Sequence, residues 1–281
     1  MLTVLEVVKK TSEFFASKGI ESPRLNAELL LGHVLGLPRM RLYLEFERPL
    51  SEAELTAVRE LVRRRGRREP LQHVLGHTDF CGLRLKTDGR ALIPRPETEL
   101  LVETVVARVG TAPATILDLG TGSGAIALAL AVAYPQAAVT AIDESPGALE
   151  LARENAASTG LADRITFVQS DWFEGLPKEA RFDLVVSNPP YLSQDEVGSA
   201  EPEVREHEPI GALLAGDAGL ADLERISLLA AAVLQPAGML AVETGTGHHA
   251  RLALLLSGAG YARSESLKDL SGRDRFFLAW R

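Results

Sequence analysis

The sequence predicts an α/β protein in which a doubly wound, mainly parallel sheet follows a small helical bundle. From residue 114 onward, short apolar runs alternate with helical patterns, and this alternation is typical of parallel strands joined by covering helices. Residues 1–77 show only helical periodicity. The chain has 281 residues, more than the roughly 100–200 of one typical domain. We therefore expect two domains.

Residues 1–77 are predicted to form the helical domain. Ser22 before Pro23 is typical of a helix start, because proline suits the first helical position. Ser51 followed three residues later by Glu54 predicts a capping box. That helix carries apolar residues along one side and is expected to end near Gly66.

Residues 78–93 are predicted to be a linker built on a β-hairpin. Thr78–Lys86 alternates apolar and polar side chains around Gly82, as a short hairpin does. Pro94-Arg95-Pro96 then interrupts regular structure. A helix is expected from Glu97 to about Val109, opening a third region, residues 94–281.

The strands and helices of residues 94–281 are expected in alternation. Strands are predicted at 115–119, 139–142, 165–168, 184–186 and 238–242, and helices at 125–132, 145–159 and 220–234. Phe276–Trp280 is expected to be the last strand, at an antiparallel edge. The loop from Leu192 to Gly219 is unusually long for such a fold, and loops of this length are usually functional or mobile.

Composition argues against several classes of protein. The longest apolar stretches, such as Ala125–Ala133, are much shorter than the roughly 20 residues of a membrane span. The first residues do not read as a secretory leader. Cys81 is the only cysteine, which rules out an intramolecular disulfide and favours a reducing cytoplasm. His73 and His77 have no accompanying carboxylate motif, so we expect no metal site.

Charge is unevenly distributed along the chain. The net charge is −8, yet residues 1–90 hold 16 basic against 12 acidic side chains and the remainder 14 against 26. Six arginines lie in Arg59–Arg68, which predicts a solvated helix face or, alternatively, a surface that docks a protein partner. Six acids lie in Asp195–Glu208. That segment is interpreted as a solvated loop or as a lid that discriminates partners.

A glycine-rich loop follows the first predicted strand of the sheet. After Asp118 and Leu119 come Gly120, Thr121, Gly122, Ser123 and Gly124, directly before a helix. Glycines let a backbone turn tightly and approach a ligand, and a helix start offers free N–H groups. The glycines are two residues apart, unlike the dinucleotide fingerprint, and this spacing is closer to loops that bind S-adenosylmethionine.

Acidic residues follow the next two strands. Asp143 ends the second strand, where a carboxylate can accept hydrogen bonds from both hydroxyl groups of a ribose. Alternatively, Asp143 caps the following helix. Asp171 and Trp172 follow the third strand. Asp171 is predicted to accept a hydrogen bond from an adenine amino group, and Trp172 either borders that ring or packs in the core.

The segment Ser187-Asn188-Pro189-Pro190-Tyr191 follows the fourth strand and carries the reactive chemistry. An amide or aromatic amino nitrogen is a poor nucleophile because its lone pair is delocalised. The Asn188 side-chain oxygen and the Pro189 carbonyl can accept hydrogen bonds from both N–H groups of this nitrogen. These hydrogen bonds would orient the nitrogen and favour positive charge on it. Pro190 stiffens the turn, and Tyr191 offers a face to a planar amide. A transfer to a planar nitrogen needs no covalent enzyme intermediate.

These motifs resemble those of class I S-adenosylmethionine methyltransferases, which have a Rossmann-like sheet and modify planar nitrogens. Ile93–Glu99, the glycine loop, Asn188–Tyr191, and the segments Glu208-Pro209 and Ala212-Leu213 more specifically resemble the HemK/PrmC family. This resemblance extends over nearly the whole chain, including the helical domain and the hairpin.

The resemblance implies transfer of a methyl group to N5 of the glutamine in the Gly-Gly-Gln motif of peptide chain release factors. Gly120–Gly124, Asp143, Trp172 and Asn188 would contact the cofactor, and Asn188 through Tyr191 would hold the glutamine side chain.

Other functions stay open on the sequence alone. The same chemistry would serve a ribosomal protein L3 glutamine methyltransferase. A DNA adenine-N6 methyltransferase is less favoured, because the C-terminal region is acidic and shows no target-recognition domain. A non-catalytic, cofactor-binding adaptor is a further alternative. We expect a cytoplasmic monomer that acts on a protein and binds neither a membrane nor nucleic acid directly.

Overall fold

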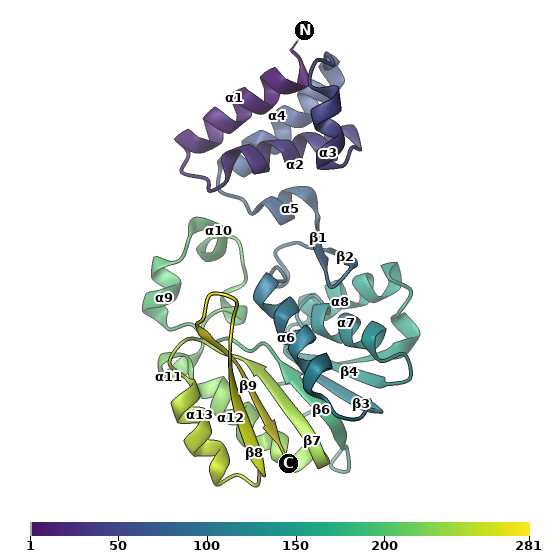
Figure 1. Ribbon diagram of the computed structural model, residues 1–281, viewed down its shortest axis with the longest axis vertical. Coiled ribbons are helices and arrows are strands. Elements are labelled where there is room, and N and C mark those ends of the chain that lie inside the picture. The colour runs from purple at the N-terminus through teal and green to yellow at the C-terminus, as the bar shows by residue number, and fades with distance from the viewer. Residues whose placement is uncertain (1) are drawn as a thin grey trace. The chain divides into compact units, whose positions relative to one another are not determined.

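The computed structural model describes residues 2–281, apart from the side chains of residues 217 and 218. The chain forms two compact units (Figure 1). The helical unit comprises Met1–Gly76 and Glu201–His207, and the sheet unit comprises His77–Ala200 and Glu208–Arg281. The helical unit thus includes a short segment that the predicted boundaries leave with the sheet. Within residues 2–281, no helix combines the length and apolar character needed to span a membrane.

The helical unit is a bundle around one apolar core. Its elements are α1 (Val4–Ser17), α2 (Pro23–Leu35), α3 (Arg39–Leu42), η1 (Tyr43–Glu45), α4 (Glu52–Gly66), α5 (Leu71–Leu75) and α10 (Pro202–Arg205). The capping box at Ser51 and Glu54 is confirmed: the Ser51 N–H donates to Glu54 Oε2 at 2.8 Å. Phe15, Leu30 and Leu31 are fully buried in the core of the bundle.

The arginines of Arg59–Arg68, which lie in α4 and just after it, do not form a uniformly solvated face. Arg65 is buried, donates to Asn26 Oδ1 at 2.8 Å, and forms an ion pair with Glu203 at 2.8 Å. Arg68 binds Glu203 and Glu201, each at 2.6 Å. The prediction of a solvated face is therefore wrong for Arg65, because the acidic segment Glu201–His207 packs against this helix as part of the same unit.

The sheet unit contains a hairpin and a seven-stranded sheet. The hairpin pairs β1 (His77–Phe80) with β2 (Leu83–Lys86), as predicted. The sheet has the order β5-β4-β3-β6-β7-β9-β8. Its strands are β3 (Thr115–Leu119), β4 (Ala138–Asp143), β5 (Ile165–Gln169), β6 (Phe182–Ser187), β7 (Leu234–Glu243), β8 (Arg263–Lys268) and β9 (Asp274–Trp280). The first five in this spatial order are parallel, while β9 and β8 pair antiparallel.

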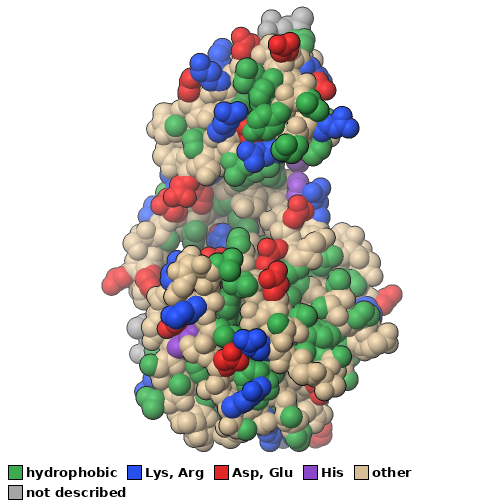
Figure 2. Space-filling model, in the orientation of Figure 1, with side chains coloured by type: hydrophobic (Ala, Val, Ile, Leu, Met, Phe, Trp, Pro, Cys, Tyr) green, Lys and Arg blue, Asp and Glu red, His purple; other side chains and the backbone are tan. Residues whose placement is uncertain are grey.

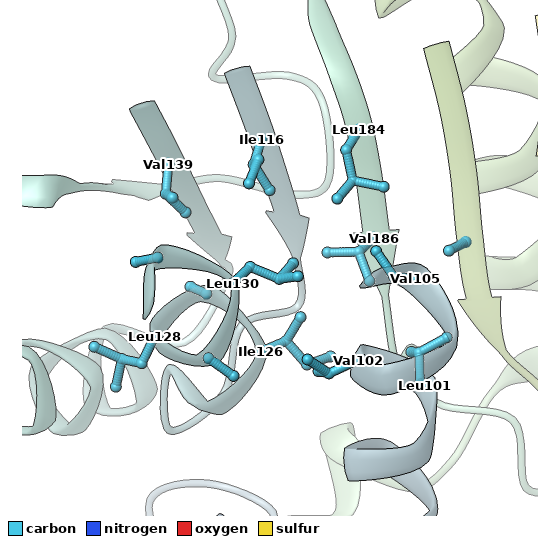
Figure 3. Close-up of a cluster of buried hydrophobic side chains, with 14 of the residues drawn as sticks. Leu101, Val102, Val105, Ile116, Ile126, Leu128, Leu130, Val139, Leu184 and Val186 are labelled. Atoms are coloured by element: carbon cyan, nitrogen blue, oxygen red, sulfur yellow. The ribbon is translucent and has the colours of Figure 1, made fainter. Parts of the chain in front are cut away.

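Helices cover both faces of the sheet (Figure 1). They are α6 (Pro96–Arg108), α7 (Ala125–Ala133), α8 (Pro146–Ser158), α12 (Ala221–Val233) and α13 (His249–Ser257), with the shorter α9 (Gln194–Ser199), α11 (Gly216–Gly219), η2 (Ala162–Arg164) and η3 (Ile210–Ala212) in connections. Side chains alternate along each strand between two cores. In Figure 3, Ile116 of β3 and Leu184 of β6 extend from the sheet toward Ile126 of α7. Leu117 and Val185 point to the opposite core, with α12 and α13.

The predicted α/β architecture is confirmed, with one correction at the end of the sheet. Phe276–Trp280 lies in β9, which is antiparallel as expected, but β8 pairs with its outer side. β9 is therefore not an edge strand. Arg263–Lys268 escaped prediction because it is mostly polar, and its exposed pattern is that of an edge strand with little apolar surface to bury.

Candidate active site

A cavity of about 580 Å³ lies in the sheet unit at the carboxyl ends of the parallel strands. The loops after β3, β4, β5 and β6 all contribute to its lining, as do residues 90–95 and 209–214. The order of the strands turns around between β3 and β6, because the chain proceeds from β3 to β4 on one side and later adds β6 on the other. Ligands of doubly wound sheets bind at such a switch point.

The glycine loop after β3 forms one wall of the cavity. Gly120, Gly122 and Gly124 have positive φ angles of 68°, 54° and 84°, a conformation that glycine adopts without a steric penalty. Gly120, Thr121, Gly122 and Ser123 line the cavity. Gly124 does not, and a Cβ atom there would lie 3.2 Å from the Ala152 Cβ. Its role is to let α7 begin close to α8.

Asp143 fastens this loop from the end of β4. Its Oδ2 accepts from the Gly122 N–H at 2.8 Å, and its Oδ1 accepts from the Ser145 N–H at 2.9 Å. Ser145, rather than Asp143, caps α8 through its side chain. Asp143 also lines the cavity, and burial raises the pKa of its carboxyl group.

Asp118 lies beneath the loop and is fully buried. Its Oδ2 accepts from the Thr121 hydroxyl at 2.6 Å and from the Ala127 N–H at 3.1 Å. Its Oδ1 has no hydrogen-bond partner among the described residues. Burial, the main cause, raises the pKa of Asp118 to about 7, although the hydrogen bonds from Thr121 and Ala127 favour its ionised form.

Asp171 and Trp172 follow β5 and border the same cavity. Asp171 forms an ion pair with Arg225, at 2.7 Å. Trp172 has a positive φ of 46°, which is uncommon for a bulky residue. Strained conformations of this kind cluster at active sites and ligand-binding sites. Its indole N–H donates to Asp222 Oδ1 at 3.2 Å, and a Cβ at Gly120 would lie 3.3 Å from its ring. Trp172 therefore packs in the core and borders the cavity at once.

The Asn188–Tyr191 turn after β6 is divided between the cavity and the interior. Asn188 and Pro190 line the cavity, while Pro189 is buried. The Tyr191 hydroxyl points to a buried carboxylate and donates to Glu243 Oε1 at 3.1 Å. Burial, followed by the Glu243 charge, raises the pKa of Tyr191.

Thr98, Glu243 and Arg275 support this turn and were not predicted from the sequence as site residues. The Asn188 Nδ2 donates to Thr98 Oγ1 at 3.0 Å, and that hydroxyl donates to Glu243 Oε2 at 2.8 Å. Arg275 donates to the Tyr191 hydroxyl at 3.2 Å. Glu243 could have been found, because it ends β7 at the same edge of the sheet, where polar residues gather.

Two further segments meet beside the cavity. Glu208 is buried, accepts from the Ile93 N–H at 3.2 Å, and forms an ion pair with Arg95. Pro94, Arg95 and Pro209 line the cavity. The motif segments Ile93–Glu99 and Glu208-Pro209 are therefore neighbours in the fold, although more than a hundred residues separate them in the sequence.

Solved structures show the same fold at low sequence identity. The catalytic domain of hMettl16 superposes with a TM-score of 0.58 at 22% identity, covering 79% of this chain and 81% of that one. A methyltransferase from Pyrococcus furiosus gives a TM-score of 0.53 at 18% identity, over 71% of this chain and 89% of that one. Residues 96–201 match the family model of the methyltransferase small domain.

Sequence relatives are much closer and cover nearly the whole chain. Residues 6–76 match the model of the PrmC N-terminal domain. The release factor glutamine methyltransferase of Rhodopirellula baltica is 41% identical over 97% of this chain and 94% of its own length. That of Geobacter sulfurreducens is 43% identical over 97% and 95%. That of Deinococcus radiodurans is 44% identical over 94% and 93%. The chain therefore belongs to the release factor glutamine methyltransferase family.

Proposed function

We propose that this protein transfers the methyl group of S-adenosylmethionine to the N5 side-chain nitrogen of the glutamine in the Gly-Gly-Gln motif of peptide chain release factors. The observation that carries the proposal is the position of Asn188. Its side-chain amide lines the same cavity as the glycine loop, so a bound cofactor and a planar amide can meet there.

The residues that line the cavity suit S-adenosylmethionine. At Gly120 and Gly122, which line the cavity, no side chain separates the backbone from a ligand, so the loop and the start of α7 can approach the methionine and ribose portions. Asp143 offers carboxylate oxygens to the ribose hydroxyls, and Asp171 and Trp172 border the place of the adenine. When bound, the cofactor supplies an electrophilic methyl group on a sulfonium.

Asn188 and Pro189 act on the nucleophile. The Asn188 Oδ1 and the Pro189 carbonyl accept hydrogen bonds from the two N–H groups of the glutamine amide. These two hydrogen bonds hold the nitrogen toward the methyl donor. These acceptors stabilise the positive charge that develops on nitrogen as the new bond forms. The stiffness of the two prolines keeps them aimed without reorganisation. The Tyr191 ring is proposed to bound one side of the amide, while its hydroxyl is fixed by Glu243.

The helical unit is proposed to recognise the release factor. Exposed Arg63 and its neighbours on α4 would contribute to docking, and the sheet unit would perform the chemistry. On the face shown in Figure 2, basic and acidic side chains are interspersed on the helical unit, so we expect docking to depend on shape as well as on charge. We further propose that the enzyme acts as a cytoplasmic monomer.

The test is incubation of the purified protein with methyl-labelled S-adenosylmethionine and either a release factor or ribosomal protein L3. The proposal predicts label on the release factor and none above background on L3. A release factor whose Gly-Gly-Gln glutamine is replaced by alanine should stay unlabelled. Label on L3 alone would show that the protein is a ribosomal protein L3 glutamine methyltransferase. Binding of the cofactor without transfer to any substrate would favour an adaptor.

A further inference from the structure

We propose that Thr98 is a positioning and specificity-determining residue, whose hydroxyl fixes which end of the Asn188 amide faces the substrate. This inference rests on the proposed function, in which Asn188 accepts a hydrogen bond from the target nitrogen. Thr98, Asn188, Tyr191, Glu243 and Arg275 form one connected hydrogen-bond network. Thr98 and Asn188 line the cavity, and the other three residues of the network do not.

Arg275 fixes which groups donate and which accept in this network. A guanidinium group can only donate hydrogen bonds, and Arg275 lies 3.2 Å from the Tyr191 hydroxyl oxygen. The Tyr191 oxygen must therefore accept this bond, and its single proton is free to point elsewhere. It points to Glu243 Oε1, at 3.1 Å.

Glu243 in turn fixes the role of the Thr98 hydroxyl group as a donor. Burial raises the pKa of Glu243, whereas the hydrogen bonds from Thr98 and Tyr191 and the charge of Arg275 favour its ionised form. The ionised carboxylate only accepts, and Glu243 is 1% exposed, with a hydroxyl group at each oxygen. Thr98 Oγ1 lies 2.8 Å from Glu243 Oε2, so the one proton of the Thr98 hydroxyl is used in this bond. What the Thr98 oxygen presents on its other side is a lone pair.

That lone pair decides the orientation of Asn188. The Asn188 group 3.0 Å from Thr98 Oγ1 must be the donor, Nδ2, because the carbonyl end would place two acceptors in contact. The amide carbonyl, Oδ1, is then at the opposite end. No donor among the described residues occupies it, and Asn188 lines the cavity. The network thus turns an acceptor, and not a donor, toward the substrate.

This polarity separates glutamine from glutamate. The two side chains have nearly the same shape, but the amide offers N–H donors where the carboxylate offers only acceptors. An acceptor at Asn188 Oδ1 receives the amide and repels the carboxylate. A site built to hydrogen-bond one group discriminates strongly against an analogue that cannot do so, since buried polar groups are left unpaired.

Without the Thr98 hydroxyl, the Asn188 amide would have no partner that distinguishes its ends. It could rotate and present Nδ2 to the cavity, which would donate to a carboxylate. Thr98 also lies in the first turn of α6, where loss of packing would weaken folding. Such a structural role would lower stability and overall affinity, but it would not change the preference between glutamine and glutamate.

The test measures binding of full-length release factor that carries either glutamine or glutamate in its Gly-Gly-Gln motif, with S-adenosylhomocysteine present to prevent turnover. Wild type should bind the glutamine form at least about tenfold more tightly. Thr98→Val, which keeps the size of the side chain, should reduce this ratio at least about fivefold. Thr98→Ser keeps the hydroxyl and should retain the wild-type ratio.

A Thr98→Val variant with an unchanged ratio would overturn the inference, as would a wild-type protein without preference. If Thr98→Val does not fold, Thr98→Ala provides the same comparison, with folding verified by S-adenosylhomocysteine binding. Methylation of the glutamine form by wild type is measured in parallel. Its failure would count against the proposed function, whereas normal methylation with an unchanged ratio would count against Thr98 alone.

Discussion

The glycine loop and the Asn188–Tyr191 turn follow neighbouring strands, yet they are held in different ways. The glycine loop is fixed by its own backbone conformation and by Asp143, 21 residues further along the chain. The turn is fixed by side chains from elsewhere: Thr98, 90 residues away from Asn188, and Glu243, 52 residues away from Tyr191. The glycine loop depends on residues that tolerate positive φ angles, whereas the Asn188–Tyr191 turn depends on a network of side-chain hydrogen bonds. A substitution should therefore affect cofactor binding at the first and chemistry at the second.

The largest effect is expected at the turn. Asn188→Ala removes the acceptor for the target nitrogen, and losing one such preorganised group costs about 10²–10³-fold in kcat. The affinity for the cofactor should stay largely intact, since the glycine loop and Asp143 are unchanged. Single-turnover kinetics and calorimetric titration with S-adenosylmethionine separate the two quantities. A fully active variant would show that Asn188 does not act on the nucleophile.

Asp118, buried beneath the glycine loop, is expected to make the stability of the protein depend on pH. The pKa of Asp118 is raised to about 7, above about 3.9 in an unfolded chain. Between pH 4 and pH 7, Asp118 is protonated in the native state but ionised in the unfolded chain. The contribution of Asp118 to the free energy of unfolding is therefore greatest below pH 4 and decreases as the pH rises to 7. The loss is on the order of a few kcal/mol.

Asp118→Asn should not show this dependence. Denaturant unfolding of wild type and variant at several pH values gives the difference in stability between them. That difference should shift in favour of the variant from pH 4 to pH 7. A difference that is constant with pH would mean that Asp118 is ionised throughout this range.

A smaller effect is expected from the glycine loop. Gly122→Ala places a side chain on a backbone with a φ of 54°, at a cost of about 1–2 kcal/mol. Relaxation of the loop should weaken S-adenosylmethionine binding about tenfold. Gly160→Ala is the matched control, because Gly160 has a φ of 72°, has open space around its Cα, and does not line the cavity. The control should lose similar stability but retain cofactor affinity.

The smallest effect is expected from the helical unit. Replacement of Arg63, Arg64 and Arg67 by glutamine should raise KM for a full-length release factor by about two- to threefold, as expected for exposed charges that act through solvent. Arg63 and Arg64 are already paired with Glu60 and Glu69, which limits their contribution. KM for a short Gly-Gly-Gln peptide should not change. Equal KM values for the variant and wild type on the full-length substrate would assign these arginines to the surface alone.

The sequence allowed prediction of features that depend on local patterns. The alternation of strands and helices and the hairpin at Thr78–Lys86 are confirmed by the structure. The same is true of the placement of both loops at one edge of the sheet. These features follow from periodicity, turn residues and the geometry of parallel strands.

What could not be predicted depends on contacts between distant parts of the chain. The burial of Arg65 required knowledge that Glu203 packs in the same unit. The support of Asn188 by Thr98 depends on the position of α6 beside the end of β7, which no local pattern encodes. The edge strand β8 was missed because an exposed strand needs few apolar residues.

The most direct test of the central claim is tandem mass spectrometry of a full-length release factor after incubation with this protein and S-adenosylmethionine. We predict one added methyl group, on the side-chain nitrogen of the Gly-Gly-Gln glutamine, and formation of this product about 10²–10³-fold more slowly when Asn188→Ala replaces the wild-type enzyme. A methyl group on another residue, or an unmodified release factor after cofactor binding has been demonstrated, would contradict the account.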